Sequence, residues 1–176
     1  TTIECSAFGH CDNLIKIILP ESLTEIERVA FSSCRSLTEI KIPSNVKVIR
    51  DNLFAQNQNL VKVELPAGIT CIETHAFSSC ENLKEVNLPD GLTEIGKCAF
   101  AGCDSLSYVR IPSSVTSLGE NLFLNCKPTV YAEEGSYVAQ VAKKRGYKLD
   151  TSRFSEEMSD GAEVYHLLYK VDEAGV

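Results

Sequence analysis

Apolar residues along the chain recur at a fixed spacing of 23 residues. Phenylalanine stands at positions 8, 31, 54, 77, 100 and 123, and proline stands at 20, 43, 66, 89 and 112. Apolar residues between these markers keep the same period, so the common pattern reads L-x-x-I-x-I-P-x-x-V-x-x-I-x-x-x-A-F-x-x-C-x-x. A fixed period of about 20–50 residues is typical of solenoids and other repeat architectures. The pattern therefore predicts an array of stacked repeats.

Each repeat predicts one strand, one crossing segment and one turn. The two apolar residues before each proline, such as Ile40 and Ile42, are spaced as on a strand with one buried face. Proline lacks the backbone donor of a strand ladder, so the strand ends there. The V-x-x-I segment then crosses the back, and A-F-x-x-C predicts a short helical turn with phenylalanine inward. One unit cannot bury both apolar sides, so the units are expected to stack into a continuous core.

The motif L-x-x-I-x-I-P followed by I-x-x-x-A-F-x-x-C resembles the leucine-rich repeats of the BspA-like, or treponemal, type over roughly residues 3–149. The resemblance implies a β-rich α/β solenoid of about five and a half coils of 23 residues, with parallel strands on a concave side and a C-terminal helix-strand cap. It also implies a bacterial or protist cell surface, where members of the family are described as adhesins or are uncharacterised.

Departures from the repeat divide the chain into three parts. Residues 1–132 are predicted to form the solenoid, whose first coil is incomplete, so the natural array is expected to continue upstream. Residues 133–150 are predicted to form the capping helix and strand, because Ser136 suits an N-cap and Gly146 suits the position after the helix. A terminal cap covers the open apolar side of a repeat array.

The third part, residues 151–176, is predicted to begin with an acidic linker, 151–162. From Asp150 to Val176 there are seven acidic and two basic residues. Tyr165, Leu167, Tyr169 and Val171 alternate as on a strand. This isolated strand either begins a following domain or docks as an edge strand on the cap.

Composition narrows the classes of function. The net charge of −7 argues against a nucleic-acid partner. The longest apolar stretches, such as 17–19, are far too short for membrane insertion. The sequence opens without a basic segment followed by an apolar one, so the signal and anchor of a secreted or cell-surface protein are expected to lie outside it.

Eight cysteines raise the questions of disulfides, metal and catalysis. Five share one repeat position, with Asn57 in the gap: Cys11, Cys34, Cys80, Cys103 and Cys126. Parallel side chains in such a column are badly oriented for disulfides and cannot surround a zinc ion, so a buried ladder of reduced thiols is expected. Cys5, Cys71 and Cys98 are expected to be partly exposed. His75 and Cys98 share another column, of mixed residue types, which is interpreted as structural. We therefore predict no catalytic, cofactor-binding or metal-binding residue, and no cofactor.

The concave strand face holds the candidate binding residues. Eight residues after each phenylalanine lie Lys16, Glu39, Lys62, Glu85 and Tyr108, and ten residues after it lie Ile18, Lys41, Glu64, Asn87 and Arg110. Opposite charges are expected to pair down these columns, as Lys41 with Glu64, which leaves the end with Tyr108 and Arg110 less neutralised. One interpretation is that the ladder only stabilises the fold; the other is that the face receives a partner. The predicted partner-binding residues are Ile18, Lys41, Glu64, Asn87, Tyr108 and Arg110.

The sequence favours a non-enzymatic, adhesin-like protein-interaction module of a secreted or cell-surface bacterial protein. The expected partner is a protein, such as a host extracellular or surface protein. Two alternatives stay open: an accessory segment of a larger multi-domain surface enzyme, and a spacer or stalk. The fold class does not choose among them.

Overall fold

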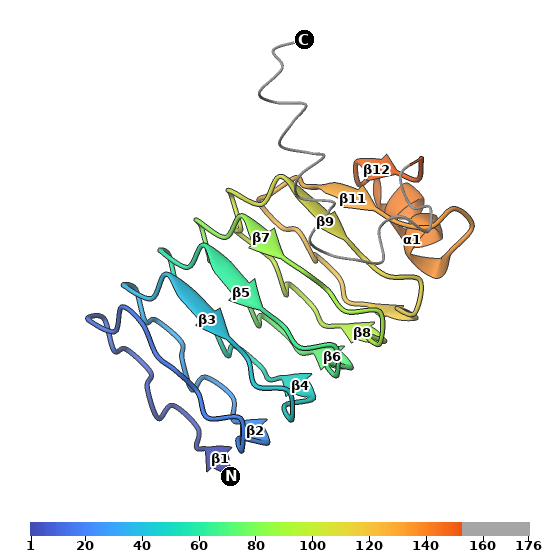
Figure 1. Ribbon diagram of the computed structural model, residues 1–176. Coiled ribbons are helices and arrows are strands. Elements are labelled where there is room, and N and C mark those ends of the chain that lie inside the picture. The colour runs from blue at the N-terminus through green and yellow to red at the C-terminus, as the bar shows by residue number, and fades with distance from the viewer. Residues whose placement is uncertain (153–176) are drawn as a thin grey trace, which may run out of the picture.

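The computed structural model describes residues 1–152, which coil into a solenoid with the first coil at one end and the only described helix at the other (Figure 1). The segments that precede the prolines lie side by side and run parallel. They include β3 (Glu39–Lys41), β5 (Lys62–Glu64), β7 (Glu85–Val86) and β9 (Tyr108–Arg110). The strand β11 (Thr129–Tyr131), which no proline follows, pairs with β9 and continues the row. Partners such as Ile40 and Val63 are one repeat apart. The predicted solenoid with parallel strands is confirmed.

The segment predicted only to cross the back forms a second parallel ladder, which we call the back ladder. Its strands are two residues long, and all but the first have one buried side chain, such as Ile49 or Ile72. They are β1 (Thr2–Ile3), β2 (Glu25–Ile26), β4 (Val48–Ile49), β6 (Cys71–Ile72), β8 (Glu94–Ile95) and β10 (Ser117–Leu118). Here too the partners are one repeat apart, as Val48 and Cys71 are.

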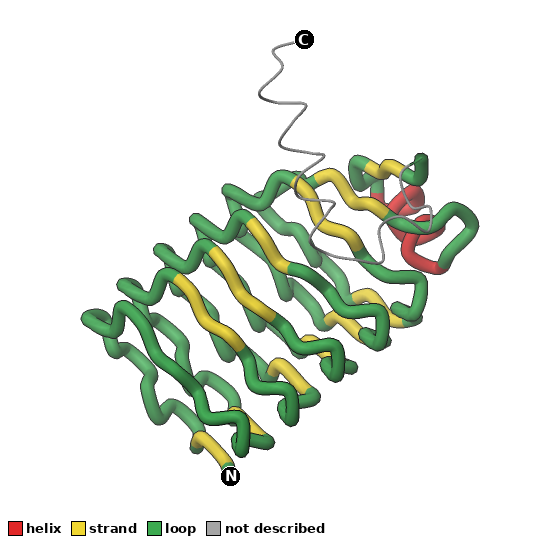
Figure 2. Tube along the Cα trace, viewed as in Figure 1, coloured by secondary structure: helices red, strands yellow, loops and turns green. Residues whose placement is uncertain are grey.

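The third side of each coil is a pair of tight turns, and the predicted short helical turn was wrong (Figure 2). The backbone is left-handed two residues before each phenylalanine and again two residues after it, at φ 62° for Val29 and 60° for Ser33. This conformation aims alternate N–H groups along the solenoid axis. Val29, Phe31 and Ser33 each donate to the next coil, at 3.1, 3.1 and 2.8 Å. The turns therefore add a third coil-to-coil ladder, which satisfies the backbone that a helix would have satisfied internally.

The phenylalanines form a continuous stack in the core. Ring centroids of neighbours lie 5.1–6.1 Å apart, and the rings are tilted by 2–24°. Four of the six rings are fully buried: Phe31, Phe54, Phe77 and Phe100. Leucine, isoleucine and valine side chains from the two strand ladders pack around them. Each coil therefore buries its apolar side chains mainly against its two neighbours.

A helix and a strand cover the far end of the array. The helix α1 (Tyr137–Arg145) begins after Ser136, whose side chain accepts a hydrogen bond from Ala139 N at 3.2 Å, and ends at Gly146 in the left-handed region, φ 68°. Its buried residues are Val138, Ala139 and Ala142. The strand β12 (Leu149–Asp150) pairs with β11. The predicted linker beyond residue 152 and the strand at 163–171 lie outside the described residues, so the domain boundaries stay predictions.

Candidate binding face

The candidate site is the outward face of the strands before the prolines, which we call the strand face. It consists of the outward side chains of residues 15–18, 38–41, 61–64, 84–87 and 107–110, segments that include β3, β5, β7 and β9. Alternation along each strand turns the central residue into the core and its neighbours outward, as with Ile40 between Glu39 and Lys41. All six predicted partner-binding residues lie on this face. Ile18, Lys41, Glu64 and Asn87 are exposed, whereas Tyr108 and Arg110 are half-buried.

Charges pair on the strand face, but not entirely as predicted. Lys16 Nζ donates to Glu39 Oε1 at 2.8 Å across adjacent coils. Lys62 Nζ lies 3.0 Å from Glu64 Oε1 on its own strand. The predicted pair of Lys41 with Glu64 was wrong, because Lys62 is two residues from Glu64 on the same face and engages it first.

The pKa values follow these pairs. The hydrogen bond from Lys16 and the attraction of its charge lower the pKa of Glu39 and raise that of Lys16. The hydrogen bond to Glu64, with weaker attraction from Glu85 and Glu39, raises the pKa of Lys62. These groups are exposed, so their pairs contribute little to the free energy of unfolding.

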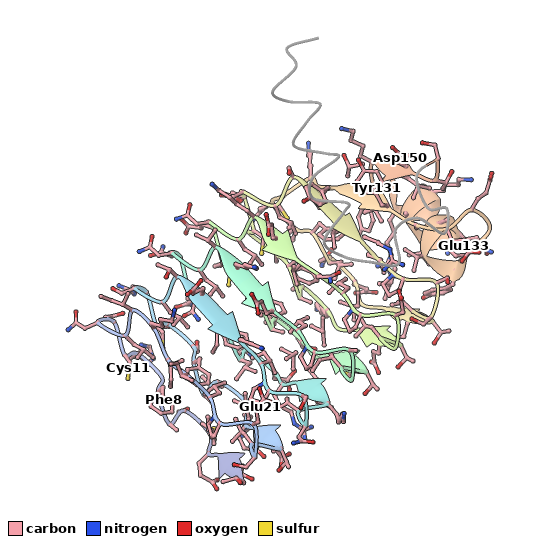
Figure 3. The ribbon with its side chains drawn as sticks, in the orientation of Figure 1. Phe8, Cys11, Glu21, Tyr131, Glu133 and Asp150 are labelled. Carbon is pink, nitrogen blue, oxygen red and sulfur yellow. The ribbon has the colours of Figure 1, made fainter. Side chains whose placement is uncertain are left out.

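A hollow of about 430 Å³ lies on the N-terminal half of the strand face. Its charged lining comes from Glu21, Lys16, Glu39, Lys41, Lys62 and Glu64, and its apolar lining includes Ile18. Glu21 and Tyr131 lie toward opposite ends of the array (Figure 3). Ile18 and Ile15 are 86% and 65% exposed, values high for isoleucine, and Val61 is also exposed. Ile18, Lys41 and Glu64 were predicted from the sequence, but the hollow was not, because the depth of a surface depends on the rotamers of the side chains around it.

The C-terminal half of the strand face is more tightly engaged than predicted. Arg110 Nη1 donates to Asp90 Oδ1 at 2.9 Å, and Asp90 follows the proline of the preceding coil. Tyr108 meets Tyr131 edge to face, with centroids 6.2 Å apart. The expectation that this end is less neutralised was wrong for Arg110, because the aspartate lies on a loop outside the strand columns.

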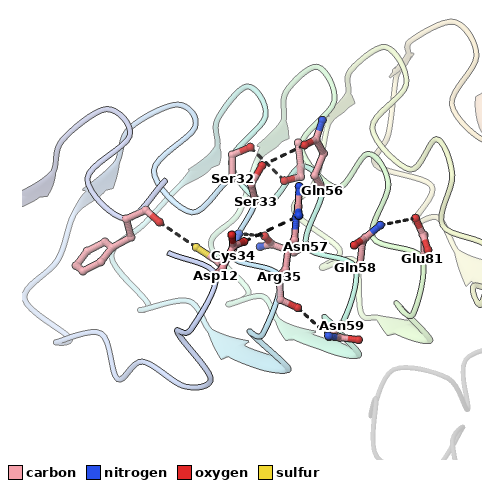
Figure 4. Close-up of polar contacts among 12 residues, drawn as sticks. Asp12, Ser32, Ser33, Cys34, Arg35, Gln56, Asn57, Gln58, Asn59 and Glu81 are labelled. Atoms are coloured by element: carbon pink, nitrogen blue, oxygen red, sulfur yellow. Dashed lines mark hydrogen bonds and ion pairs between the residues drawn. The ribbon is translucent and has the colours of Figure 1, made fainter. Parts of the chain in front are cut away.

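All eight cysteines are free thiols in the structure. Four thiols of the column, those of Cys34, Cys80, Cys103 and Cys126, each donate to the phenylalanine carbonyl of the preceding coil. The distance from Cys34 Sγ to Phe8 O is 3.0 Å (Figure 4), and that from Cys80 Sγ to Phe54 O is 3.1 Å. Cys34, Cys80 and Cys103 are buried, whereas the buried ladder was wrong for Cys11, which is exposed, and for Cys126, which is half-buried.

The remaining cysteines and histidines form no reactive cluster within residues 1–152. Cys5 is exposed and Cys71 half-buried, but the expectation of partial exposure was wrong for Cys98, which is buried. Burial raises the pKa of the Cys71 thiol to about 11, with added repulsion from Glu94 and Glu73. His75 and Cys98 both lie two residues before a phenylalanine, where the backbone of the turn is left-handed. Among the described residues, no three His, Cys, Asp or Glu side chains gather as they would around a metal ion.

Comparison with known proteins assigns the repeat. Residues 1–129 match the BspA type leucine rich repeat region in six copies. A leucine-rich repeat protein of T. pallidum is 25% identical, with a TM-score of 0.65; the match covers 78% of this chain and 86% of that one. A leucine-rich cell surface protein of Faecalibacterium prausnitzii is also 25% identical, with a TM-score of 0.59, over 77% of this chain and 51% of that one.

The pneumococcal vaccine antigen PcpA is 21% identical, with a TM-score of 0.59 over 76% of this chain and 38% of that one, and shares the fold. A search of the curated proteins gave no match.

The chain is a leucine-rich repeat protein built as a parallel solenoid. Within that class it belongs to the BspA type, because the family match spans most of the chain. Residues 1–152 contain no helix with the length and apolar character that crossing a bilayer requires.

Proposed function

We propose that this chain is a non-enzymatic, adhesin-like interaction module of a secreted or cell-surface bacterial protein, and that it binds a protein partner through the strand face. The observation that carries the proposal is the exposure of Ile15, Ile18 and Val61 on a regular polar face. Apolar side chains rimmed by polar ones are typical of protein-binding surfaces. The description of the F. prausnitzii relative as a cell surface protein supports the location.

The fold supports the choice of face. The two strand ladders and the turns hold the coils together through backbone bonds and buried side chains, so the outward side chains of the strand face are free to vary. A row of parallel strands also presents these side chains at a fixed spacing of about 4.8 Å between coils. Solenoids commonly bind partners on such extended surfaces.

A second candidate is that the repeat array is a stalk or an accessory segment of a larger surface enzyme. The ion pairs favour this alternative, because Glu39, Glu64 and Asp90 are already engaged within the chain. A face whose carboxylates are engaged within the chain has less charge to offer a partner. The two candidates differ in one respect: substitutions on the strand face weaken the binding of a partner only if that face is the binding surface.

The test is a surface-binding assay with immobilised chain and a panel of purified host extracellular proteins. Two strand-face variants are compared with the parent: Ile18→Ala with Lys41→Ala, and Tyr108→Ala with Arg110→Ala. We expect at least one to lose about 2 kcal/mol or more of binding free energy, roughly thirtyfold in affinity. The control variant, Glu94→Ala with Ser117→Ala, changes exposed residues of the back ladder. Unchanged binding by both strand-face variants, with unchanged circular dichroism, would leave the stalk as the better account.

A further inference from the structure

The hollow on the strand face is lined by three lysines and three carboxylates, and these charges are not all paired with one another. All three carboxylates that line it are engaged. Glu39 bonds Lys16, Glu64 lies against Lys62, and Glu21 Oε2 accepts from both the N–H and the hydroxyl of Ser44, each at 3.2 Å. Of the three lining lysines, Lys16 and Lys62 take part in these pairs. Lys41 forms no ion pair with any carboxylate of residues 1–152, and Glu21 bonds only the neutral Ser44. The hollow is therefore neutral in sum, but Lys41 is its one lysine without an ion-pair partner among the described residues.

The most exposed isoleucine of the chain lies one coil from this charge. Ile18 precedes Lys41 by one repeat, so the two residues occupy the same column on adjacent coils, about 4.8 Å apart in strand spacing. Ile18 is 86% exposed and Ile15, on the same coil, is 65% exposed. Glu64 follows Lys41 in the same column, because the two are partners in the pairing of β3 with β5. Along the solenoid axis this column therefore presents an apolar, a positive and a negative side chain in turn.

We propose that the N-terminal half of the strand face receives an extended protein segment that carries an apolar side chain and an acidic side chain two residues apart. The apolar side chain packs on Ile18 and Ile15, and the carboxylate pairs with Lys41. This inference rests on the proposed function and adds the place and the chemistry of recognition. Side chains two residues apart on an extended chain project to one side and are separated by about 6.7 Å, which long lysine and leucine side chains span.

The same column limits what can follow the acidic residue. A second acidic side chain two residues further along would meet Glu64, whose charge is already balanced by Lys62. Like charges at an interface disfavour the wrong partner, so a neutral or basic residue is expected there. The exposed Val61 lies two coils from Ile15 in its own column, about 10 Å away, which favours a segment of several residues over a single small molecule. Coils stack along the axis, so neighbouring repeats leave this face open.

The test uses the whole chain, labelled in its isoleucine methyl groups, and short synthetic peptides with a central Leu-Thr-Asp, Leu-Thr-Lys or Ser-Thr-Asp. We expect Leu-Thr-Asp to shift the methyl signals of Ile18 and Ile15, and the other two peptides to bind at least about tenfold more weakly. Lys41→Glu should reverse the preference toward Leu-Thr-Lys. The matched control is Lys84→Glu, which reverses an exposed lysine of the strand face outside the hollow and should leave the preference unchanged.

Three results would overturn the inference. The first is equal binding, or no binding, of the acidic and basic peptides. The second is a preference that Lys41→Glu does not reverse. The third is a dimer, seen by sedimentation, that Lys41→Glu dissolves, since the occupant would then be a second copy of this chain. In the panel assay above, loss of binding only in the Tyr108 and Arg110 variant would also overturn it, yet would uphold the strand face as a binding surface.

Discussion

At the scale of single residues, the cysteine column adds hydrogen bonds between coils. The phenylalanine carbonyl accepts the backbone N–H three residues later and also the thiol of the following coil, as Phe54 does from Asn57 N and Cys80. Asn57 interrupts this row. Its Oδ1 accepts from Cys34 N at 2.7 Å, but its Nδ2 is buried and has no hydrogen-bond partner among the described residues. A buried donor without an acceptor costs free energy that a small thiol does not.

Replacing Asn57 with cysteine should therefore stabilise the protein. The expected gain is about 1 kcal/mol in the free energy of unfolding, because the orphaned amide is removed and the thiol column becomes continuous. Cys34 N, which loses Asn57 Oδ1, is expected to bond Phe31 O instead, as Cys80 N bonds Phe77 O at 3.2 Å. Urea denaturation of the parent and of Asn57→Cys under reducing conditions gives the difference. The matched control, Cys80→Asn, places a second amide in the column and should lose stability. If Asn57→Cys proved less stable than the parent, the amide would have to be satisfied in solution.

The sequence predicted the register of the residues better than their conformation. The 23-residue period fixes which side chains stack, so the phenylalanine core and the strand columns followed directly. The left-handed turns could not be predicted in the same way. The column two residues before each phenylalanine holds serine, valine, asparagine, histidine and cysteine rather than glycine. Val29 at φ 62° is the least expected, since a branched Cβ disfavours this region. Bonds to the neighbouring coil impose the conformation, and a single repeat carries no sign of them.

At the scale of elements, the back ladder depends on how closely consecutive coils approach. Gly96 and Gly119 occupy the column that holds Glu27, Arg50 and Glu73 in earlier coils. Arg50 bridges Glu25 and Glu73, at 2.7 and 3.1 Å, whereas the glycines let the backbones come close. Gly96 N donates to Ile72 O, and Gly119 N to Ile95 O, both at 2.7 Å. Beside them, Arg145 of α1 donates to the carbonyls of Leu118 and Gly119, which ties the cap to the last back strand.

Gly96→Ala should therefore destabilise the array. A Cβ at this position would lie 2.6 Å from the backbone of Glu73 and Thr74, so two coils would have to separate. Forced overpacking of this kind costs about 1–3 kcal/mol. The matched control is Gly68→Ala, whose Cβ would meet only the flexible end of the Lys47 side chain. Thermal or urea unfolding of both variants measures the difference. Equal free energies of unfolding would show that the back ladder accommodates the extra Cβ without loss of stability.

At the scale of the whole molecule, neither the hollow nor the charge pairs of the strand face could be predicted from the sequence. Columns predicted from the repeat assume that each residue meets its counterpart one coil away, as Lys16 meets Glu39. Lys62 instead meets Glu64 on its own strand, and Arg110 reaches Asp90 on a loop. Side chains of this length choose among several partners within reach, and the repeat period does not rank them. The charge pairs of the strand face therefore could not be predicted from the period, whereas the solenoid could.

The thiol column also sets how the whole solenoid responds to alkaline pH. Burial raises the pKa of Cys80 from 9.0 to about 12, and burial also raises the pKa of Cys103. In the unfolded chain these thiols ionise near their ordinary pKa, whereas in the folded chain they keep their protons. Above pH 9 the unfolded state therefore binds fewer protons than the folded state, and stability falls as pH rises.

The full stabilising contribution of these thiols should be present below about pH 9 and be lost progressively as pH rises toward the folded pKa values. Each buried thiol is expected to remove up to about 1.4 kcal/mol per pH unit in that window. Urea midpoints of the reduced protein between about pH 8 and 10 measure the slope, below the range in which lysine and tyrosine dominate. Cys80→Ala should be less stable at every pH, because it leaves a cavity, but its slope should be shallower by one thiol. An identical slope in the parent and in Cys80→Ala would mean that this thiol ionises as readily in the folded solenoid as in the unfolded chain, and that the column opens to water before the coils separate.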